Sequence, residues 1–335
     1  MLCHSVESIY ELNLQEWNYY SNISNIIKVI LFTIGRLGVP IFLLLTGFLT
    51  LNKNFKNDED VHRFYKKNLL PIIVTTEIWI VIYTIFLIIY EKQKFSIEIL
   101  LRRMLFFEYT PSHMWYMPMI IGIYLAIPFV GNVLKSFSIQ AIKIPLCIII
   151  ISSFILPTIN NVLQIFSIKT FNIKLDLEFL GASYGIYIIL GYIISKGLLK
   201  KIKNIYLIFS TGISFIMAVG IQIFIYNRGT SYNIWYNSIF ILLTATCLFE
   251  LFTRIKNDKN KIQKVFTFLS ESSFAIFFIH KIVLICLKDN VNNININNPL
   301  KVVLMFLVTT LLCIIIILSL RKVKWIKNKV FLIKE

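Results

Sequence analysis

The chain is short of charged residues. Aspartate, glutamate, lysine and arginine make up 15% of its 335 residues, while 57% are hydrophobic and the mean hydropathy is +0.74. A soluble domain carries about 25% charged and about 45–50% apolar residues. Length alone would allow about two soluble domains, but the shortage of charge excludes that class of protein.

Paired cysteines are also lacking. The five cysteines are scattered, mostly within apolar stretches, and none forms a CxxC pair. This pattern excludes a disulfide framework and a cysteine-based zinc site, and it is typical of small buried hydrophobic residues. We therefore expect no metal site. The cysteines are Cys3, Cys147, Cys247, Cys286 and Cys313.

The chain shows no alternation of polar and apolar residues of the kind that builds a membrane barrel. What recurs instead is apolar runs of about 20 residues, which as helices cross a hydrocarbon core of roughly 30 Å. We expect an all-α, polytopic transmembrane helix bundle, with residues 1–335 forming a single membrane-embedded domain. The predicted helices are 27–51, 69–90, 115–133, 141–158, 180–196, 205–226, 233–253, 271–288 and 300–320.

The net charge of +17 comes from short basic clusters between the apolar runs. Such clusters set membrane orientation, so we expect membrane lipids and no nucleic acid as partners. One alternating set of loops, which includes the C-terminus, holds 22 lysine and arginine residues, and the other set holds 9. The rule that basic loops stay inside predicts a cytoplasmic C-terminus and an outward-facing 91–114 loop.

Arg36 lies about ten residues into the first predicted helix, which places it roughly 15 Å deep. An arginine there costs at least a few kcal/mol unless it meets a partner or a wet cavity. It is either an anion-binding group inside the bundle or a snorkelling or structurally paired arginine.

Other ionisable residues also interrupt the apolar runs. His280, beside Lys281, lies within a predicted helix and lines the interior or makes a helix-packing hydrogen bond. Glu77 is a further candidate, although a structural partner for a basic group is an equally good interpretation. His113 precedes Trp115 and Tyr116, and the two aromatic residues are typical of a membrane–water interface, which leaves the histidine unexplained.

Four segments, in order, resemble motifs of the acyltransferase-3 family of integral membrane acyltransferases. RLGVPIFLLLTGFL at 36–49 resembles its R..VP.FF..SGF segment, and HMWYMPMIIGIYLAIPFV at 113–130 resembles its HLWFL..LIGLYL..P segment. YIILGYIISK at 187–196 and SSFAIFFIH at 272–280 are similar to its GY and S..IY.IH segments. The resemblance covers nearly the whole chain, and the nearest branch is the bacterial O-acetyltransferases of surface polysaccharides.

The resemblance implies ten helices, with a histidine near the end of the first and an arginine eleven positions earlier. LCHS at 2–5 is similar to the end of that helix, which makes His4 the matching histidine. On sequence alone His4 is more simply a disordered terminal residue. We expect the first helix to be truncated, with an in-frame upstream stretch of roughly 10–20 residues supplying the rest.

The resemblance also implies a function: transfer of an acyl group, most simply acetyl, from acetyl-CoA to a hydroxyl of an extracytoplasmic glycan or lipid-linked sugar. Acetyl-CoA would be a substrate, with no bound cofactor, and the protein would lie in the bacterial inner membrane. His4 would act as base or nucleophile and Arg36 as the anion-binding group. His113, Trp115, Tyr116, His280 and Glu77 are the candidate substrate-binding residues. The alternatives are a transporter or flippase of glycan intermediates and an inactive, truncated relic.

Overall fold

The structure is a computed structural model that describes residues 1–10, 12–109, 111–171, 182–255 and 261–333. Within these residues it contains helices and no β-strand, which confirms the all-α prediction. The α-helices are α1 (Leu2–Ile9), α2 (Leu14–Tyr19), α3 (Asn22–Arg36), α4 (Gly38–Thr50), α5 (Asp58–Phe64), α6 (Leu70–Tyr90), α7 (Ile97–Met104), α8 (Tyr116–Ser136), α9 (Ile139–Ile150), α10 (Leu156–Ile165), α11 (Ala182–Ser195), α12 (Asn204–Asn227), α13 (Ile239–Thr253), α14 (Lys261–Asn292) and α15 (Asn298–Leu320). Short 3₁₀ or π-helical turns are η1 (Tyr65–Leu69), η2 (Ser112–Trp115), η3 (Ile151–Ile155) and η5 (Ile326–Val330).

Every apolar run predicted from the sequence forms helix over most of its length. Seven helical segments of the described chain are long and apolar enough to cross a membrane, and two shorter apolar helices, Ser183–Ser195 and Ile239–Thr253, accompany them. The seven are Asn22–Thr50, Asp58–Tyr90, Ser112–Ser136, Ile139–Ile165, Asn204–Asn227, Gln263–Asn292 and Asn298–Leu320. The chain is therefore a polytopic membrane protein.

The first long segment is broken where α3 meets α4. Pro40 has no N–H, so the carbonyl of Arg36 loses the partner that an uninterrupted helix would supply. At the same point the Leu37 N–H donates to the Ile34 carbonyl at 3.2 Å, three residues back and not four. The regular pattern resumes with the Ile41 N–H, which donates to the Leu37 carbonyl at 3.1 Å. Arg36 is thus the last residue of a helix rather than a residue in the middle of one.

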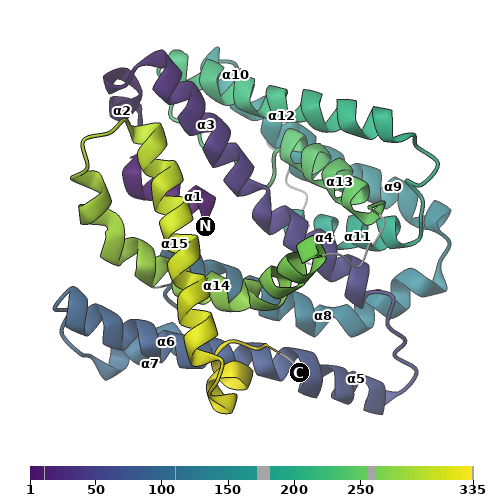
Figure 1. Ribbon diagram of the computed structural model, residues 1–335. Coiled ribbons are helices and arrows are strands. Elements are labelled where there is room, and N and C mark those ends of the chain that lie inside the picture. Colours follow the sequence, from purple (N-terminus) through teal and green to yellow (C-terminus); the bar gives the residue numbers. More distant parts are fainter. Residues whose placement is uncertain (11, 110, 172–181, 256–260, 334–335) are drawn as a thin grey trace.

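Helix α1 is short but well packed. It contacts α3, α14 and α15, and the N-terminus lies in the middle of the molecule (Figure 1). Gly35 permits this packing: a Cβ there would lie 2.4 Å from the backbone nitrogen of Cys3. The resemblance at LCHS implied the end of a helix here, but residues 1–9 carry no clear helix signal of their own, because eight residues rarely form a helix without tertiary contacts.

Two predicted loops are partly helical. The 91–114 loop contains α7, whose N-terminus is capped by Ser96 Oγ accepting from the Ile99 N–H. The polar stretch 290–300 begins inside α14, which runs to Asn292, and α15 starts at Asn298. These corrections shorten the loops and leave the order of the apolar helices unchanged.

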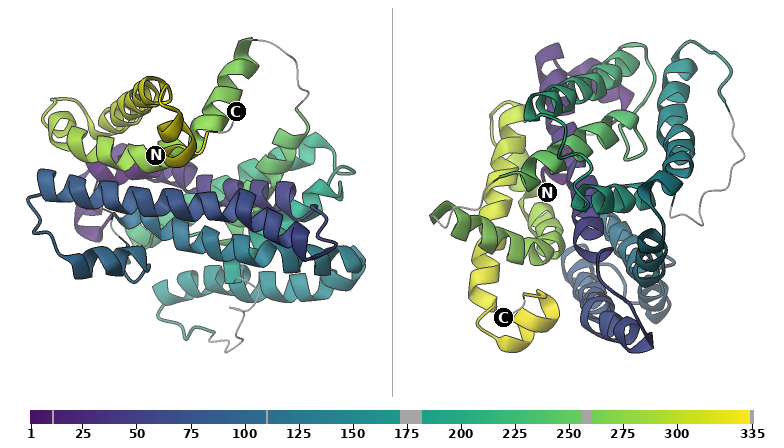
Figure 2. Two further views of the ribbon diagram at one scale, coloured as in Figure 1. Left: turned by 90° about the horizontal axis from the view of Figure 1, so that it is seen from below. Right: turned by 90° about the vertical axis from the view of Figure 1, so that its right-hand side faces the viewer.

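Two glycines allow α4 and α11 to cross with their backbones close together. A Cβ on Gly47 would lie 1.9 Å from the Ile188 carbonyl oxygen, and one on Gly191 would lie 2.0 Å from the Leu44 carbonyl oxygen. Small residues let membrane helices approach backbone to backbone. By contrast, the α9–α10 pair lies at the edge of the bundle (Figure 2), where only 11% of its most apolar stretch is buried by protein.

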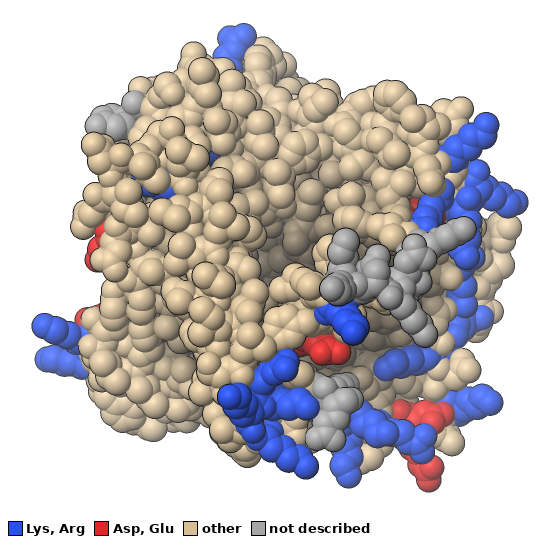
Figure 3. Space-filling model, viewed as in Figure 1, with Lys and Arg blue, Asp and Glu red and all other residues tan. Residues whose placement is uncertain are grey.

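The charged side chains are unevenly distributed. Figure 3 shows lysine and arginine gathered along the lower and right-hand edges of the face that it displays, while most of the rest is uncharged. A broad uncharged surface suits contact with lipid, and basic residues gathered at one edge fit a membrane boundary.

Candidate active site

His4 and Arg36 meet on one carboxylate. The Nδ1 atom of His4 lies 2.6 Å from Oε2 of Glu7, three residues along α1. Nη2 of Arg36, at the end of α3, lies 3.5 Å from Oε1 of the same glutamate. The side chains are 21% (His4), 8% (Arg36) and 28% (Glu7) exposed. Two residues that the sequence predicted separately are therefore joined by a third that it did not single out.

Aromatic rings surround the Arg36 guanidinium. Its central carbon lies 4.3 Å from the ring centroid of Trp235 and 4.6 Å from that of Phe32. Nη1 donates a hydrogen bond to the Tyr236 hydroxyl at 3.2 Å, while the buried Nε atom has no partner in the structure. Arg36 is thus held by ring contacts and two polar partners, and it keeps donor capacity for a ligand.

The segment between α12 and α13 carries Trp235 and Tyr236 to Arg36. Its backbone is satisfied by side chains of the bundle: the Ile234 N–H donates to Gln222 Oε1 at 3.1 Å, and the Tyr187 hydroxyl donates to the Tyr236 carbonyl at 2.6 Å. Non-helical backbone inside a membrane protein needs such partners. They hold the two aromatic residues in place over the arginine.

Three histidine rings come together from distant parts of the chain. The ring centroid of His4 lies 5.4 Å from that of His280 on α14 and 6.1 Å from that of His113 in η2, and the last two are 5.1 Å apart. His113 and His280 are each 2% exposed. Within the described residues, no side chain or backbone group meets hydrogen-bond geometry with Nε2 of His280 or with the ring nitrogens of His113, although the His113 ring interacts with the Phe277 backbone. Nδ1 of His280 lies 3.0 Å from the Ile276 carbonyl.

Buried polar atoms without partners are uncommon and call for an explanation. Here three such nitrogens belong to rings packed around His4. A bound water or a polar group of a ligand would satisfy them, which makes this cluster a candidate substrate-contact surface.

Trp115 and Tyr116 connect the two groups of residues. The Trp115 ring lies 5.8 Å from those of Tyr236 and Tyr184, so it belongs to the aromatic surroundings of Arg36. The Tyr116 ring packs 5.5 Å from that of Phe277, which is itself 5.1 Å from His113. The HMWY stretch at 113–116 therefore places its histidine with the other histidines and its tryptophan beside the arginine.

Glu77 lies on α6, and none of its described contacts joins it to this cluster. Its Oε2 atom is buried and has no hydrogen-bond partner within the described part of the chain. The structure thus brings together six of the seven residues predicted from the sequence and leaves Glu77 outside the group.

Sequence reasoning did not find Glu7, Trp235 and Tyr236. Glu7 had a local signal, because a residue three positions from His4 shares its helix face, but the resemblance placed LCHS at the end of the first helix and did not extend that helix to Glu7. Trp235 and Tyr236 meet Arg36 across about 200 positions, and aromatic residues in a loop between membrane helices look like interface anchors.

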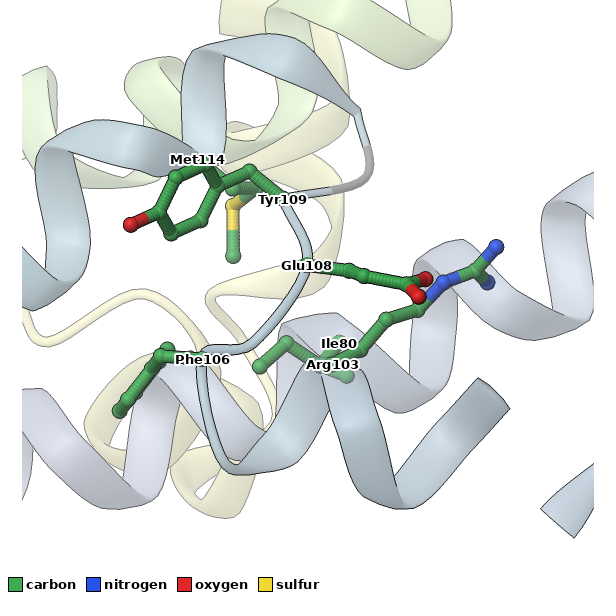
Figure 4. A pocket seen from close by; sticks show the side chains of 6 residues that line it. All are labelled: Ile80, Arg103, Phe106, Glu108, Tyr109 and Met114. Atoms are coloured by element: carbon green, nitrogen blue, oxygen red, sulfur yellow. The ribbon is translucent and has the colours of Figure 1, made fainter. Parts of the chain in front are cut away.

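A small cavity is lined in part by Met114, the residue after His113. Its volume of about 10 Å³ suits roughly one water molecule. Figure 4 shows the six side chains around it, from α6, α7, the segment after α7, and η2. They are Ile80, Arg103, Phe106, Glu108, Tyr109 and Met114. None of the clustered histidines lines this cavity.

Within the described residues, no three His, Cys, Asp or Glu side chains are placed to hold a metal ion. A comparison with protein families finds one match: a model described as an acyltransferase domain, that of the acyltransferase-3 family, covers residues 2–318. No curated protein and no solved structure matches the chain.

Proposed function

We propose a function from one premise: the chain belongs to the acyltransferase-3 family. It is accordingly a membrane acyltransferase, since its helices are long and apolar enough for a polytopic membrane protein. The proposal is that it moves an acetyl group from acetyl-CoA to a hydroxyl of an extracytoplasmic glycan or lipid-linked sugar, in the inner membrane of a bacterium. The nearest branch would be the surface-polysaccharide O-acetyltransferases.

The observation that carries the proposal is the meeting of His4 and Arg36 on Glu7. A histidine supplies a base whose ordinary pKa is near neutral. An arginine beside it supplies fixed positive charge and several N–H donors. Acyl transfer from a thioester needs both, because a hydroxyl must lose its proton while negative charge develops on the carbonyl oxygen.

The proposed step runs as a direct transfer. The acceptor oxygen attacks the acetyl carbonyl carbon while its proton passes to Nε2 of His4, and the resulting oxyanion lies against Arg36. The C–S bond then breaks, the ester remains on the acceptor, and the thiolate of CoA takes the proton back from His4. The products are the acetylated acceptor and CoA in its thiol form.

His113, His280, Trp115 and Tyr116 would contact the acceptor. The unpartnered ring nitrogens of His113 and His280 can hydrogen-bond sugar hydroxyls. Trp115, beside Tyr236 and Tyr184, offers an aromatic face to a sugar ring. Glu77 lacks a described contact with this cluster, so we give it no part in the step.

The rival function is a flippase or transporter that uses the same polar groups as a path. The test supplies radiolabelled acetyl-CoA to membranes that contain the protein and to matched membranes with His4→Ala. Acetyl label on the glycan or lipid-linked sugar that depends on His4 supports the proposal. Movement of unmodified sugar without label would favour the flippase. Neither label nor movement would favour an inactive chain.

A further inference from the structure

Glu7 occupies a position between the basic groups of the site. One oxygen lies 2.6 Å from His4 Nδ1 and the other 3.5 Å from Arg36 Nη2. The Lys281 ammonium, beside His280 on α14, also interacts electrostatically with this carboxylate. A half-buried glutamate with three basic neighbours is ionised and fully engaged, and nothing about acyl transfer itself requires it to react.

The short contact to Nδ1 determines where His4 carries its proton. A carboxylate can only accept a hydrogen bond, so the atom facing it at 2.6 Å must be an N–H. In neutral imidazole one nitrogen holds the hydrogen and the other keeps its lone pair. With the hydrogen on Nδ1, the lone pair is on Nε2, the nitrogen that faces away from Glu7.

We propose that Glu7 is a positioning residue: it holds the proton of His4 on Nδ1, so that Nε2 is the base, and it aligns His4 with Arg36 through its second oxygen. This inference rests on the proposed function, in which His4 accepts the hydroxyl proton. It adds a residue and a role that neither the family match nor the sequence supplies.

The two-sided contact explains why a glutamate is needed. A glutamine could accept from Nδ1–H through its oxygen, but its NH₂ group would then face the guanidinium, and two donors repel. An aspartate keeps both oxygens but is one methylene shorter. Helix α1 cannot shift to compensate, because Cys3 already sits against Gly35.

The first test measures acetyl transfer from radiolabelled acetyl-CoA to the envelope glycan fraction, in the full-length protein in membranes. Glu7→Gln should lower kcat at least about a hundredfold, since a catalytic histidine that loses its orienting carboxylate can lose up to about 10⁴ in kcat, and it should leave the KM for acetyl-CoA within about twofold. Glu7→Asp should retain an intermediate rate. Glu98→Gln, the same change on an exposed glutamate of α7, is the matched control and should behave like the parent.

A double-mutant cycle separates positioning from a merely structural role. If Glu7 acts through His4, then Glu7→Gln should cause no further loss in a His4→Ala background, because the two groups act as a unit. An equal loss in both backgrounds would overturn the proposal.

The second test does not depend on acetyl transfer. Diethyl pyrocarbonate modifies the nitrogen of an imidazole that carries the lone pair, and mass spectrometry resolves each histidine. Modification of His4 should slow several-fold in Glu7→Leu, which removes both accepting oxygens and lets the proton move to Nε2, while exposed His62 on α5 serves as the internal reference and keeps its rate. An unchanged His4 rate would contradict the proposal even if transfer falls. A slowed His4 in a protein that transfers no acetyl group would keep the role of Glu7 in setting the tautomer and remove the acetyltransferase function.

Discussion

At Arg36, a guanidinium is stable at membrane depth because several groups share its charge. Phe32 and Trp235 place ring faces beside it, Tyr236 accepts one N–H, and Glu7 neutralises part of the charge. Ring contacts of this kind contribute about 0.5–2 kcal/mol each, with the larger values in desolvated sites. The Nε atom has no hydrogen-bond partner among the described residues. The contacts that hold Arg36 in place therefore leave one of its N–H donors free.

Replacing Arg36 should separate activity from folding. Arg36→Ala and Arg36→Lys should both insert, because removing or shortening a buried cation lowers the insertion cost. Alanine should lose at least about 3 kcal/mol of transition-state stabilisation, which is about a hundredfold in rate. Lysine should also lose most activity, because it keeps the charge but not the planar fork that stacks on Trp235. Acetate transferred per molecule of inserted protein is the measurement.

Tyr236→Phe is the graded comparison for this prediction. It keeps the ring beside the guanidinium and removes only the hydroxyl that accepts from Nη1. The expected loss is about 1 kcal/mol, or a few-fold in rate. Near-normal transfer by Arg36→Ala, with less protein in the membrane, would make Arg36 a structural residue.

The sequence points to single residues of this site, because a charged or polar residue in an apolar stretch is costly to bury. It does not show which of these residues lie together. His4, Arg36, His113 and His280 interrupt apolar stretches or align with family motifs. Their grouping depends on contacts between helices that are far apart in the chain, and a local sequence pattern does not reveal such contacts. Tyr236 is the clearest example, because its hydroxyl meets Arg36 across 200 positions.

At the scale of elements, α1 determines whether the site exists. It carries His4 and Glu7, and it is held by packing on α3, α14 and α15 because eight residues have little helical stability of their own. Its fit depends on a single missing methyl group at Gly35, which directly precedes Arg36. The residue against which α1 packs and the arginine that contacts Glu7 are therefore consecutive in the chain.

Gly35→Ala should reduce activity through the position of α1. The new Cβ would lie 2.4 Å from the Cys3 backbone nitrogen, so α1 must move and take His4 and Glu7 away from Arg36. A displacement of about 1 Å can cost about a hundredfold in rate. Gly38→Ala, with no atom within 4 Å of the added carbon, is the matched control. Acetyl transfer and yield of both variants are measured together, and equal activity would show that α1 does not need this seat.

The α4–α11 crossing leads to a prediction about stability. Gly47→Ala and Gly191→Ala each place a carbon about 2 Å from a partner carbonyl oxygen, so the helices must separate. Overpacking of this kind costs about 1–3 kcal/mol or more, and the variants should unfold at lower temperature in detergent. Gly212→Ala, in open surroundings on α12, should unfold at or above the parent's temperature. Unchanged unfolding temperatures for Gly47→Ala and Gly191→Ala would mean that α4 and α11 lie farther apart than the structure shows.

Apolar runs predicted the elements well because length and hydropathy are local properties. The prediction of one helix over 27–51 was wrong at Arg36, where α3 ends and α4 begins at Gly38, a break that Pro40 explains. Two features escaped prediction. Helix α7 is amphipathic and short, so it lacks the hydropathy of a span. The segment that carries Trp235 into the bundle is stabilised by Gln222 and Tyr187 from other helices, which no local pattern reveals.

At the scale of the whole molecule, the folded arrangement brings together loops that the sequence separates. Most of the lysine and arginine side chains visible in Figure 3 gather along the lower and right-hand edges. The sequence places 22 of them in the loop set that includes the C-terminus and 9 in the other set. Because a membrane protein keeps its more basic loops in the cytoplasm, this asymmetry predicts an orientation for the site as well. The η2 residues proposed to contact the acceptor lie at the end of the 91–114 loop, which belongs to the less basic set.

Labelling of single cysteines tests this orientation. In a background without the five native cysteines, Ser96→Cys lies in the 91–114 loop and Asn328→Cys in the basic tail after α15. Both positions are partly exposed. A thiol reagent that cannot cross the membrane should label Ser96→Cys in intact cells, and it should reach Asn328→Cys only after the membrane is opened, because the positive-inside rule places the tail in the cytoplasm. Labelling of both from outside would break the topology. Labelling in the reversed order would put the acceptor-contacting side in the cytoplasm, and an extracytoplasmic glycan could then no longer be the substrate.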